Sequence, residues 1–488
     1  MYRKTLCAVA LAVAWSAPLS VRAQDAELAK IREEIRQMKQ TYEKRIEALE
    51  KRLQETEAKA GKAADSAAQA ESTASTASIA STAAQAAVLA SSRPSAESAL
   101  NPGMSAILNG VYANLKRDPN RYRINGFVPT MGDVGPGKRG LSLGESELGF
   151  AANIDHMFRG NLIASISPDN SRIEVEEGYI QTIGLSGGFT VKAGRFFSAA
   201  GYQNQIHAHA WDFTDAPLAM KVFLGNQLKE DGIQLKWIAP TDLYFDVGLE
   251  LGRGRAFPAG PDGGRNKNGF GSGNLFTHLG GDIGSSVAWQ AGISYLATSP
   301  QNRTYSDLDS TGTLVTDSFT GDSRLRVLDG VLKWSPNGNP TYSNFKLQGE
   351  YFRRKENGAL TYNADPANAP GAAAGTLTDS YASRQSGWYL QGVYQFVPMW
   401  RVGYRYDRLN AGATSVGLVA SGALAAADFP ILGGYNPKRS TWMVDWSPSE
   451  FSRVRLQFAR DYSRIGLTDN QIFLQYIVSM GANGAHKF

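Results

Sequence analysis

The sequence has a single cysteine, Cys7, and no long hydrophobic run. Residues 1–23 carry two basic residues near the start, an apolar run over 6–15 and then Val21-Arg22-Ala23, which is typical of a cleavable signal peptide. Because Cys7 lies inside this segment, we expect the exported chain to have no thiol, disulfide or cysteine metal site. No stretch reaches the roughly 18 apolar residues of a spanning helix, so no helical membrane anchor is expected.

Strong net charge and catalytic motifs are also lacking. The net charge is +5 from 50 basic and 45 acidic residues, and no basic cluster interleaved with aromatic residues suggests a nucleic-acid surface. The segment Gly144-Glu145-Ser146-Glu147-Leu148 lacks the second glycine of a nucleophile elbow, and the calcium-like loop from Asp307 has Ser318 at its twelfth position. We therefore expect no enzyme, no cofactor and no nucleic-acid partner.

A heptad pattern follows the signal peptide, over residues 24–60. Its apolar positions recur at steps of three and four with one stutter, which predicts a periplasmic coiled coil that self-associates. The seam consists of Leu28, Ile31, Ile35, Met38, Tyr42, Ile46, Leu49 and Leu53. The alternative is a solvated monomeric helix. Residues 61–100, rich in Ala, Ser and Thr, are predicted to be a linker or helical spacer.

From residue 101 to 488 the hydrophobic period changes to two. Trp400, Val402 and Tyr404 alternate with Arg401 and Arg405, for example, which indicates an apolar face and a charged face. A soluble sandwich also alternates, but an apolar-out and polar-in barrel in a membrane fits as well. We predict sixteen strands, at 104–114, 143–153, 156–167, 173–183, 188–196, 231–239, 242–252, 273–282, 285–296, 323–335, 343–354, 385–396, 399–409, 437–447, 451–462 and 470–480.

The predicted connections favour the membrane barrel. Long loops alternate with short turns such as Pro240-Thr241 and Pro398, as expected if the turns face the periplasm and the loops face outward. A sandwich has no reason to keep this alternation. The fold class is therefore predicted to be all-β, a transmembrane antiparallel barrel preceded by an α-helical coiled-coil stalk.

The leader, the coiled coil, about sixteen strands with alternating loops, a long third outer loop and the terminal Phe488 together resemble the phosphate-selective porin O/P superfamily, and in layout its stalked, trimeric DcaP-like porins. The resemblance implies a homotrimer, a third loop that folds into the lumen, and Phe488 as the signal read by the barrel-assembly machinery. It covers the whole chain in layout.

The third outer loop, residues 197–230, therefore supplies the candidate pore constriction. It contains His207, His209 and Asp212, and the His-x-His pair is also a candidate zinc or copper site if a third ligand approaches. The alternatives are an ordinary surface loop and a pair of polar groups that line the lumen.

Charged side chains on the inward phase of the strands complete the candidate lumen. The cations are Lys192, Lys346, Arg401, Arg405, Arg453 and Arg455, and the main acidic candidates are Glu174 and Glu176. A basic wall opposite an acidic wall would create a transverse field that selects ions. The alternative is merely a wetted wall.

These patterns predict a porin of the Gram-negative outer membrane, with its stalk in the periplasm. It would pass small hydrophilic solutes by diffusion, with anions or carboxylates favoured. Outer-membrane lipid and other copies of the chain are the expected partners, and peptidoglycan is a further candidate for the stalk. Two alternatives stay open: a metal-uptake receptor that uses His207 and His209, and a structural envelope anchor.

Overall fold

The computed structural model describes residues 103–130, 134–166, 172–260 and 268–481, which belong to the second of two compact units, Thr73–Phe488. The predicted signal peptide, the coiled coil with its seam from Leu28 to Leu53, the linker and Phe488 lie outside these residues. No helix in the described part of the chain is long and apolar enough to cross a membrane.

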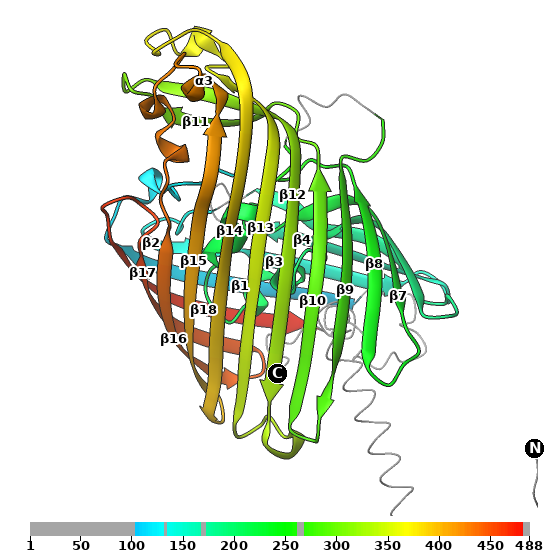
Figure 1. The fold of residues 1–488 in the computed structure, drawn as a ribbon. Helices are drawn as coiled ribbons and strands as arrows, with labels where there is room; N and C mark the ends of the chain where they lie inside the picture. The colour runs from blue at the N-terminus through cyan, green and yellow to red at the C-terminus, as the bar shows by residue number, and fades with distance from the viewer. Residues whose placement is uncertain (1–102, 131–133, 167–171, 261–267, 482–488) are drawn as a thin grey trace, which may run out of the picture. The chain divides into compact units, whose positions relative to one another are not determined.

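Strands dominate the described residues and form one sheet (Figure 1). The strand segments are β1 (Gly103–Leu115), β2 (Gly140–Leu143), β3 (Ser146–Asn153), β4 (Phe158–Ile166), β5 (Ile173–Thr182), β6 (Phe189–Phe197), β7 (Lys229–Ile238), β8 (Tyr244–Gly252), β9 (Ser272–Ile283), β10 (Val287–Thr298), β11 (Arg303–Leu308), β12 (Leu314–Trp334), β13 (Asn344–Tyr362), β14 (Leu377–Val397), β15 (Trp400–Val416), β16 (Lys438–Ser449), β17 (Ser452–Asp461) and β18 (Asp469–Gly481). Two short helices, α2 (Leu218–Leu224) and α3 (Gly417–Ala420), lie in loops.

The sheet closes on itself as an antiparallel barrel. Each wall strand pairs with its neighbours in the chain, and β1 pairs with β18 from Ser105↔Gly481 to Leu115↔Gln471. The eighteen segments make sixteen wall positions, because β2 and β3 both pair with β1 and together form one interrupted strand, whereas β11 pairs only with the upper part of β12. The prediction of a barrel with sixteen strands is confirmed.

Side chains alternate between the two faces of the wall. Along β14, Trp388, Leu390 and Tyr394 are exposed on the outside, whereas Gln391 and Gln395 are buried on the inside. Keeping such aromatic and aliphatic surface away from water is favourable by about 25 cal/mol per Å². The outside is therefore suited to lipid and the inside to water and polar side chains, as in transmembrane barrels of the outer-membrane type.

The connections differ at the two ends of the barrel. At one end tight turns join the strands, and at the β3–β4 turn the backbone N–H groups of Met157 and Phe158 donate to Asp155 Oδ1 at 2.7 and 2.8 Å. At the other end lie longer loops, among them residues 198–228 and 417–437. The alternation predicted from the sequence is confirmed.

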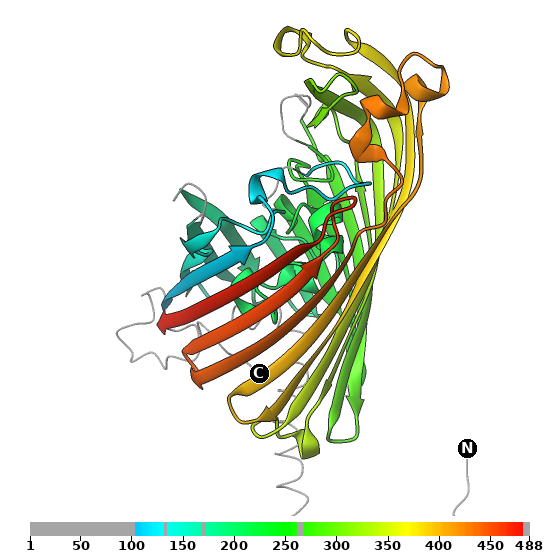
Figure 2. The same ribbon diagram turned by 90° about the vertical axis from the view of Figure 1, so that its left-hand side faces the viewer.

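Strands β12 to β15 are longer than predicted and rise beyond the rest of the wall at the loop end (Figure 2). The pairing of β12 with β13 continues up to Ser318↔Thr361. This is well past Leu328, the last apolar residue of the lipid-facing surface in this part of β12. There the outward positions are polar, so the apolar pattern that marked the strands stops while the backbone pairing continues. Sequence periodicity reports the lipid-facing part of a strand rather than its full length.

Candidate functional site in the barrel lumen

The third long loop, L3 (residues 198–228, between β6 and β7), folds against the inner face of the barrel. Its helix α2 is wholly buried and ends at Gly225, whose φ of 65° is accessible to glycine at little cost. The helix packs against Phe352, Tyr389 and Leu409, which point inward from β13, β14 and β15. L3 is thus a buried element of the lumen.

One side of L3 meets acidic residues of the wall. His207 Nδ1 lies 3.1 Å from Glu147 Oε2 and 3.3 Å from Glu176 Oε2, and His207 Nε2 lies 3.1 Å from Glu177 Oε2. His209 Nδ1 lies 2.8 Å from Glu147 Oε1. We call these five buried residues the His–Glu cluster. Burial alone would lower the pKa of His207, but the neighbouring carboxylates raise the pKa well above its ordinary value. His207 thus bridges L3 to the wall.

Two irregularities in the strands turn these carboxylates inward. Glu147 follows the interruption between β2 and β3, where one extra residue is accommodated opposite β1. In β5 the register with β4 shifts between Ile163 and Ala164, so that Glu176 is unpaired and both it and Glu177 face the lumen. Simple alternation would place Glu177 outside, which is why sequence reasoning missed it.

The opposite side of L3 meets basic residues. Asp212 Oδ2 lies 2.9 Å from Lys346 Nζ, and Asp212 Oδ1 lies 3.2 Å from Arg401 Nη1. Arg401 also pairs with Asp445 at 2.6 Å. Asp212 therefore anchors L3 to β13 and β15, and the carboxylate grouped with the two histidines is Glu147 instead.

Asp215 is the second acidic anchor on this side. It accepts hydrogen bonds from Arg405 at 3.1 Å, from Lys221 at 3.0 Å and from Arg439. Burial raises its pKa, but Arg439, Lys221 and Arg405 outweigh burial and hold the pKa well below its ordinary value. Asp215 and Arg439 were not among the predicted site residues.

We call Arg401, Arg405, Arg439, Arg453 and Arg455 the arginine wall, on β15, β16 and β17. Most of its charge is balanced by Asp212, Asp215, Asp407, Asp445 and Asp461. Arg453 differs, since among the described residues it has no carboxylate within ion-pair distance, and its Nη2 donates to the backbone carbonyl of His209.

Other predicted lumen residues fall in separate places. Lys192 is buried, and its Nζ lies 4.6 Å from the ring centre of Tyr179. Glu174 is exposed near the start of β5 and takes no part in the His–Glu cluster. The lumen thus contains a carboxylate-rich side on β3 and β5 and a guanidinium-rich side on β15 to β17, with L3 bound to both.

Comparisons with known proteins gave no matching family model. An uncharacterized protein of Aquifex aeolicus (strain VF5) is 29% identical over 377 residues, which are 72% of this chain and 71% of that protein. Among solved structures, similar chains include the channel DcaP of Acinetobacter baumannii (12% identity, TM-score 0.44, 78% of this chain and 97% of that chain). The anion-selective porin from Comamonas acidovorans is also similar (10% identity, TM-score 0.45, 78% and 99%). With TM-scores this low, function has to be inferred from this chain's own residues.

Proposed function

We propose that this protein is a porin, a channel through which small hydrophilic solutes diffuse across the outer membrane of a Gram-negative cell. The observation that carries the proposal is L3, bound inside a closed barrel between a carboxylate-rich and a guanidinium-rich side. A barrel with about sixteen strands is wide enough for a water-filled channel, and a loop fixed in it by ion pairs would narrow the path.

We propose further that the constriction favours anions. Arg453 of the arginine wall has no carboxylate partner among the described residues, whereas the carboxylates of the His–Glu cluster are contacted by His207, and Lys229 lies 3.9 Å from Glu176. Opposed charges across a narrow path orient dipolar solutes. The sign of the charge that has no partner in the protein decides which ions pass. Carboxylates and inorganic anions are the solutes that this arrangement suits.

Planar-bilayer conductance of the purified full chain tests both statements. We expect stepwise conductance, in groups of three if the coiled coil fixes a trimer, with a reversal potential of anion-selective sign under a salt gradient. Arg453→Gln should shift the reversal potential toward cations. Lys116→Gln, at an exposed position after β1, is the control and should not. Absence of conductance from folded protein would refute the porin and favour a structural envelope anchor.

A second candidate role concerns the His–Glu cluster. Ligand atoms of Glu147, His207 and His209 all lie within 4.8 Å of one another. His207 Nδ1 and Glu176 Oε2 are buried, and neither has a hydrogen-bond partner. Their separation of 3.3 Å is close to the edge of a tetrahedron with zinc–ligand bonds of about 2.0 Å. We propose that a divalent cation such as Zn²⁺ binds here and fastens L3 to β3 and β5.

Calorimetric titration of the purified protein with Zn²⁺ tests this site. We expect His207→Gln to abolish binding, whereas His278→Gln should leave it intact, because His278 is a buried histidine paired with Asp246 elsewhere in the lumen. Equal binding by both variants would remove the site from consideration. Metal uptake by an energised receptor is disfavoured, since such receptors have about 22 strands and a plugged lumen.

A further inference from the structure

Strands β12 to β15, which rise beyond the rest of the barrel, carry basic side chains on their outer face. These side chains lie directly above the outward-facing aromatic residues of the same strands. Arg324, Lys355 and Arg384 occupy one row across β12, β13 and β14, since Arg324 pairs with Lys355 and Lys355 with Arg384 in the register. All three are exposed. One step lower, Arg326 pairs with Arg353, and both are likewise exposed.

The basic surface continues on the next two strands. Arg408 of β15 pairs with Lys438 of β16, one further step below the row of Arg353. Barrel strands are tilted by about 40° from the barrel axis. A band of residues at one height in the membrane must therefore shift to lower positions on each successive strand from β12 to β16. We call these seven residues the cation band. Since the long loops share this end of the barrel, the band lies at the outer interface of the membrane.

The charges of the band are not balanced by the protein. None of the seven has an ion-pair partner among the described residues. Two of them contact aromatic rings: the guanidinium of Arg326 lies 6.0 Å from the ring centre of Tyr295, and Lys438 Nζ lies 5.3 Å from that of Tyr462. The one outward acid on β12 to β16 at this level is Asp322, one step above Arg324. Like charges directly opposite each other on paired strands are destabilising, so the arrangement calls for an anion from outside the chain.

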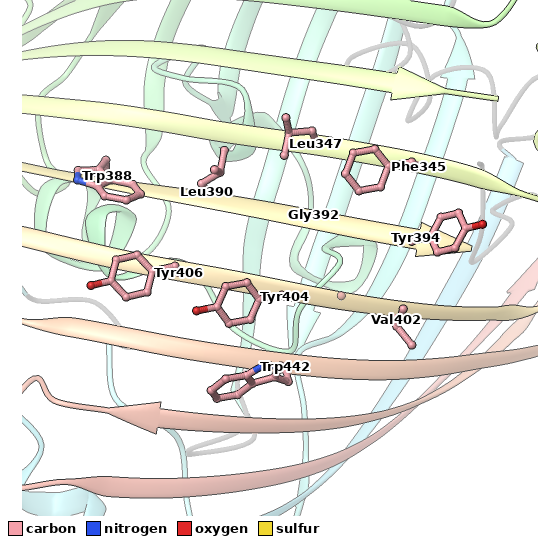
Figure 3. A pocket seen from close by; sticks show the side chains of 11 residues that line it. Phe345, Leu347, Trp388, Leu390, Gly392, Tyr394, Val402, Tyr404, Tyr406 and Trp442 are labelled. Carbon is pink, nitrogen blue, oxygen red and sulfur yellow. The ribbon is translucent and has the colours of Figure 1, made fainter. Parts of the chain in front are cut away.

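Below the band, on the same strands, the outer surface has an apolar groove (Figure 3). Its floor is at Gly392, which stands in the row between Leu347 of β13 and Tyr404 of β15 and leaves a gap where its neighbours carry side chains. Trp388, Tyr394 and Trp442 form part of its rim. From Tyr404 to Arg408 the distance along β15 is about 13 Å at the rise of a β-strand.

We propose that this surface binds a membrane lipid with phosphate groups on its headgroup, with the phosphates on the cation band and an acyl chain in the groove at Gly392. Guanidinium and ammonium groups are the natural partners of phosphate. The groove supplies apolar contact at the depth of the acyl chains of a membrane lipid. The inference rests on the barrel spanning an outer membrane, which is part of the proposed function, but not on conduction.

Native mass spectrometry of the purified full chain in detergent, titrated with diphosphoryl lipid A as the probe, tests the proposal. We expect bound lipid on the unaltered protein. The pair Lys355→Gln with Arg384→Gln should weaken binding about tenfold or more, given the contribution of each basic residue at an anionic lipid surface. The matched pair Lys116→Gln with Arg121→Gln removes two exposed cations outside the band and should leave binding unchanged.

The groove is tested separately. Gly392→Leu fills it without changing charge, and its Cβ would lie 3.3 Å from Phe345 Cε2, a tight contact that a ring can relieve. We expect weaker lipid binding than with Gly330→Leu, the same change at an open outward position of β12, where the nearest atom lies 3.8 Å away.

Three results would overturn the proposal. One is equal lipid binding by the band variant and its control. Another is binding of inorganic phosphate, seen as a thermal shift that the band variant loses, without binding of lipid A. The third is dissociation of the oligomer in the band variant with lipid retained, which would make this face a contact between copies of the chain. Because conductance is not the readout, a failure here is distinct from a failure of the porin proposal.

Discussion

Asp215 joins three cations that come from different parts of the chain: Lys221 of α2, Arg405 of β15 and Arg439 of β16. Its pKa is held well below the ordinary value, chiefly by Arg439 once burial is overcome. A carboxyl with a depressed folded pKa contributes stability that is present above its unfolded pKa, near 4, and is lost only as the pH falls below that value. L3 should therefore stay bound to the arginine wall across the neutral range.

Asp215→Asn should release this side of L3. The change leaves Lys221, Arg405 and Arg439 buried without their shared carboxylate, which typically costs about 3–5 kcal/mol when one partner of a buried pair is removed. We expect larger and noisier single-channel currents and faster proteolysis within 198–228. Asp242→Asn, at an exposed tight turn, should change neither quantity. Currents like those of the parent protein would show that L3 does not depend on this anchor.

The pKa of Asp317, in the β11–β12 hairpin above the lipid-facing surface, is shifted in the opposite direction to that of Asp215. Burial raises its pKa to about 7, and its Oδ2 has no hydrogen-bond partner. The folded hairpin keeps a proton that the unfolded chain releases near pH 4, so its stability should fall as the pH rises from about 4 to about 7. Asp317→Asn should remove this pH dependence, because an amide does not titrate. The hairpin should still form, since the amide oxygen can accept the hydrogen bond from the backbone N–H of Asn363.

Hydrogen exchange of the β11 amides at pH 6 and pH 8 measures the effect. We expect exchange in the parent protein to be faster at pH 8 than the change in intrinsic rate explains, and this excess to vanish in Asp317→Asn. Asp322→Asn, exposed on the same strand, should keep the excess. No excess in the parent would contradict the assignment.

Individual contacts were the hardest feature to predict from sequence. The inward phase of Lys346, Arg401, Arg405, Arg453 and Arg455 followed from alternation, and each of these side chains contacts L3 or its partners. On the acidic side alternation placed Glu176 inward but missed Glu147 and Glu177, because register irregularities beside them break the alternation. Nothing local to the sequence indicated that Asp212 would turn away from His207.

Strands and turns were far more predictable than contacts. A lipid-facing strand must keep apolar residues at every second position, and tight turns require Pro, Gly, Asn or Asp, so both leave a local pattern. Helix α2 has only seven residues, which is too short for a helical period to be recognised. It forms because the lumen wall buries its apolar residues, a cause that lies in β13, β14 and β15.

The stability of α2 should depend on Phe223. Its ring stacks on Phe352 at 5.8 Å and meets Phe127 edge-on at 5.8 Å. Phe223→Ala removes these contacts and leaves a cavity, at a typical cost of about 3–5 kcal/mol. We expect faster hydrogen exchange in α2 with the barrel strands unchanged. Phe451→Ala, an exposed residue at the tight-turn end, is the control. Unchanged exchange in α2 would mean that the ion pairs alone hold L3.

At the scale of the whole molecule, the barrel and the predicted coiled coil should be separable. All barrel pairings described above involve residues from 103 onward, so removal of residues 24–60 should leave a folded barrel. If the heptad seam fixes the oligomer, the particle mass from light scattering should fall from that of a trimer toward that of a monomer. Removal of residues 61–100 alone should preserve the mass. A trimer that survives the first deletion would assign oligomerisation to the barrel.

The closure of β1 against β18 dictates when the barrel can be completed. Asn109 and Gln475 share a hydrogen bond across 366 positions of the chain, so the first wall strand lacks one neighbour until the last has been synthesised and exported. Until then two unpaired strand edges are open to other chains, and such edges promote aggregation. The barrel can therefore close only after the whole chain has been synthesised. A truncation that removes β18 should be degraded or aggregate rather than accumulate as a smaller barrel.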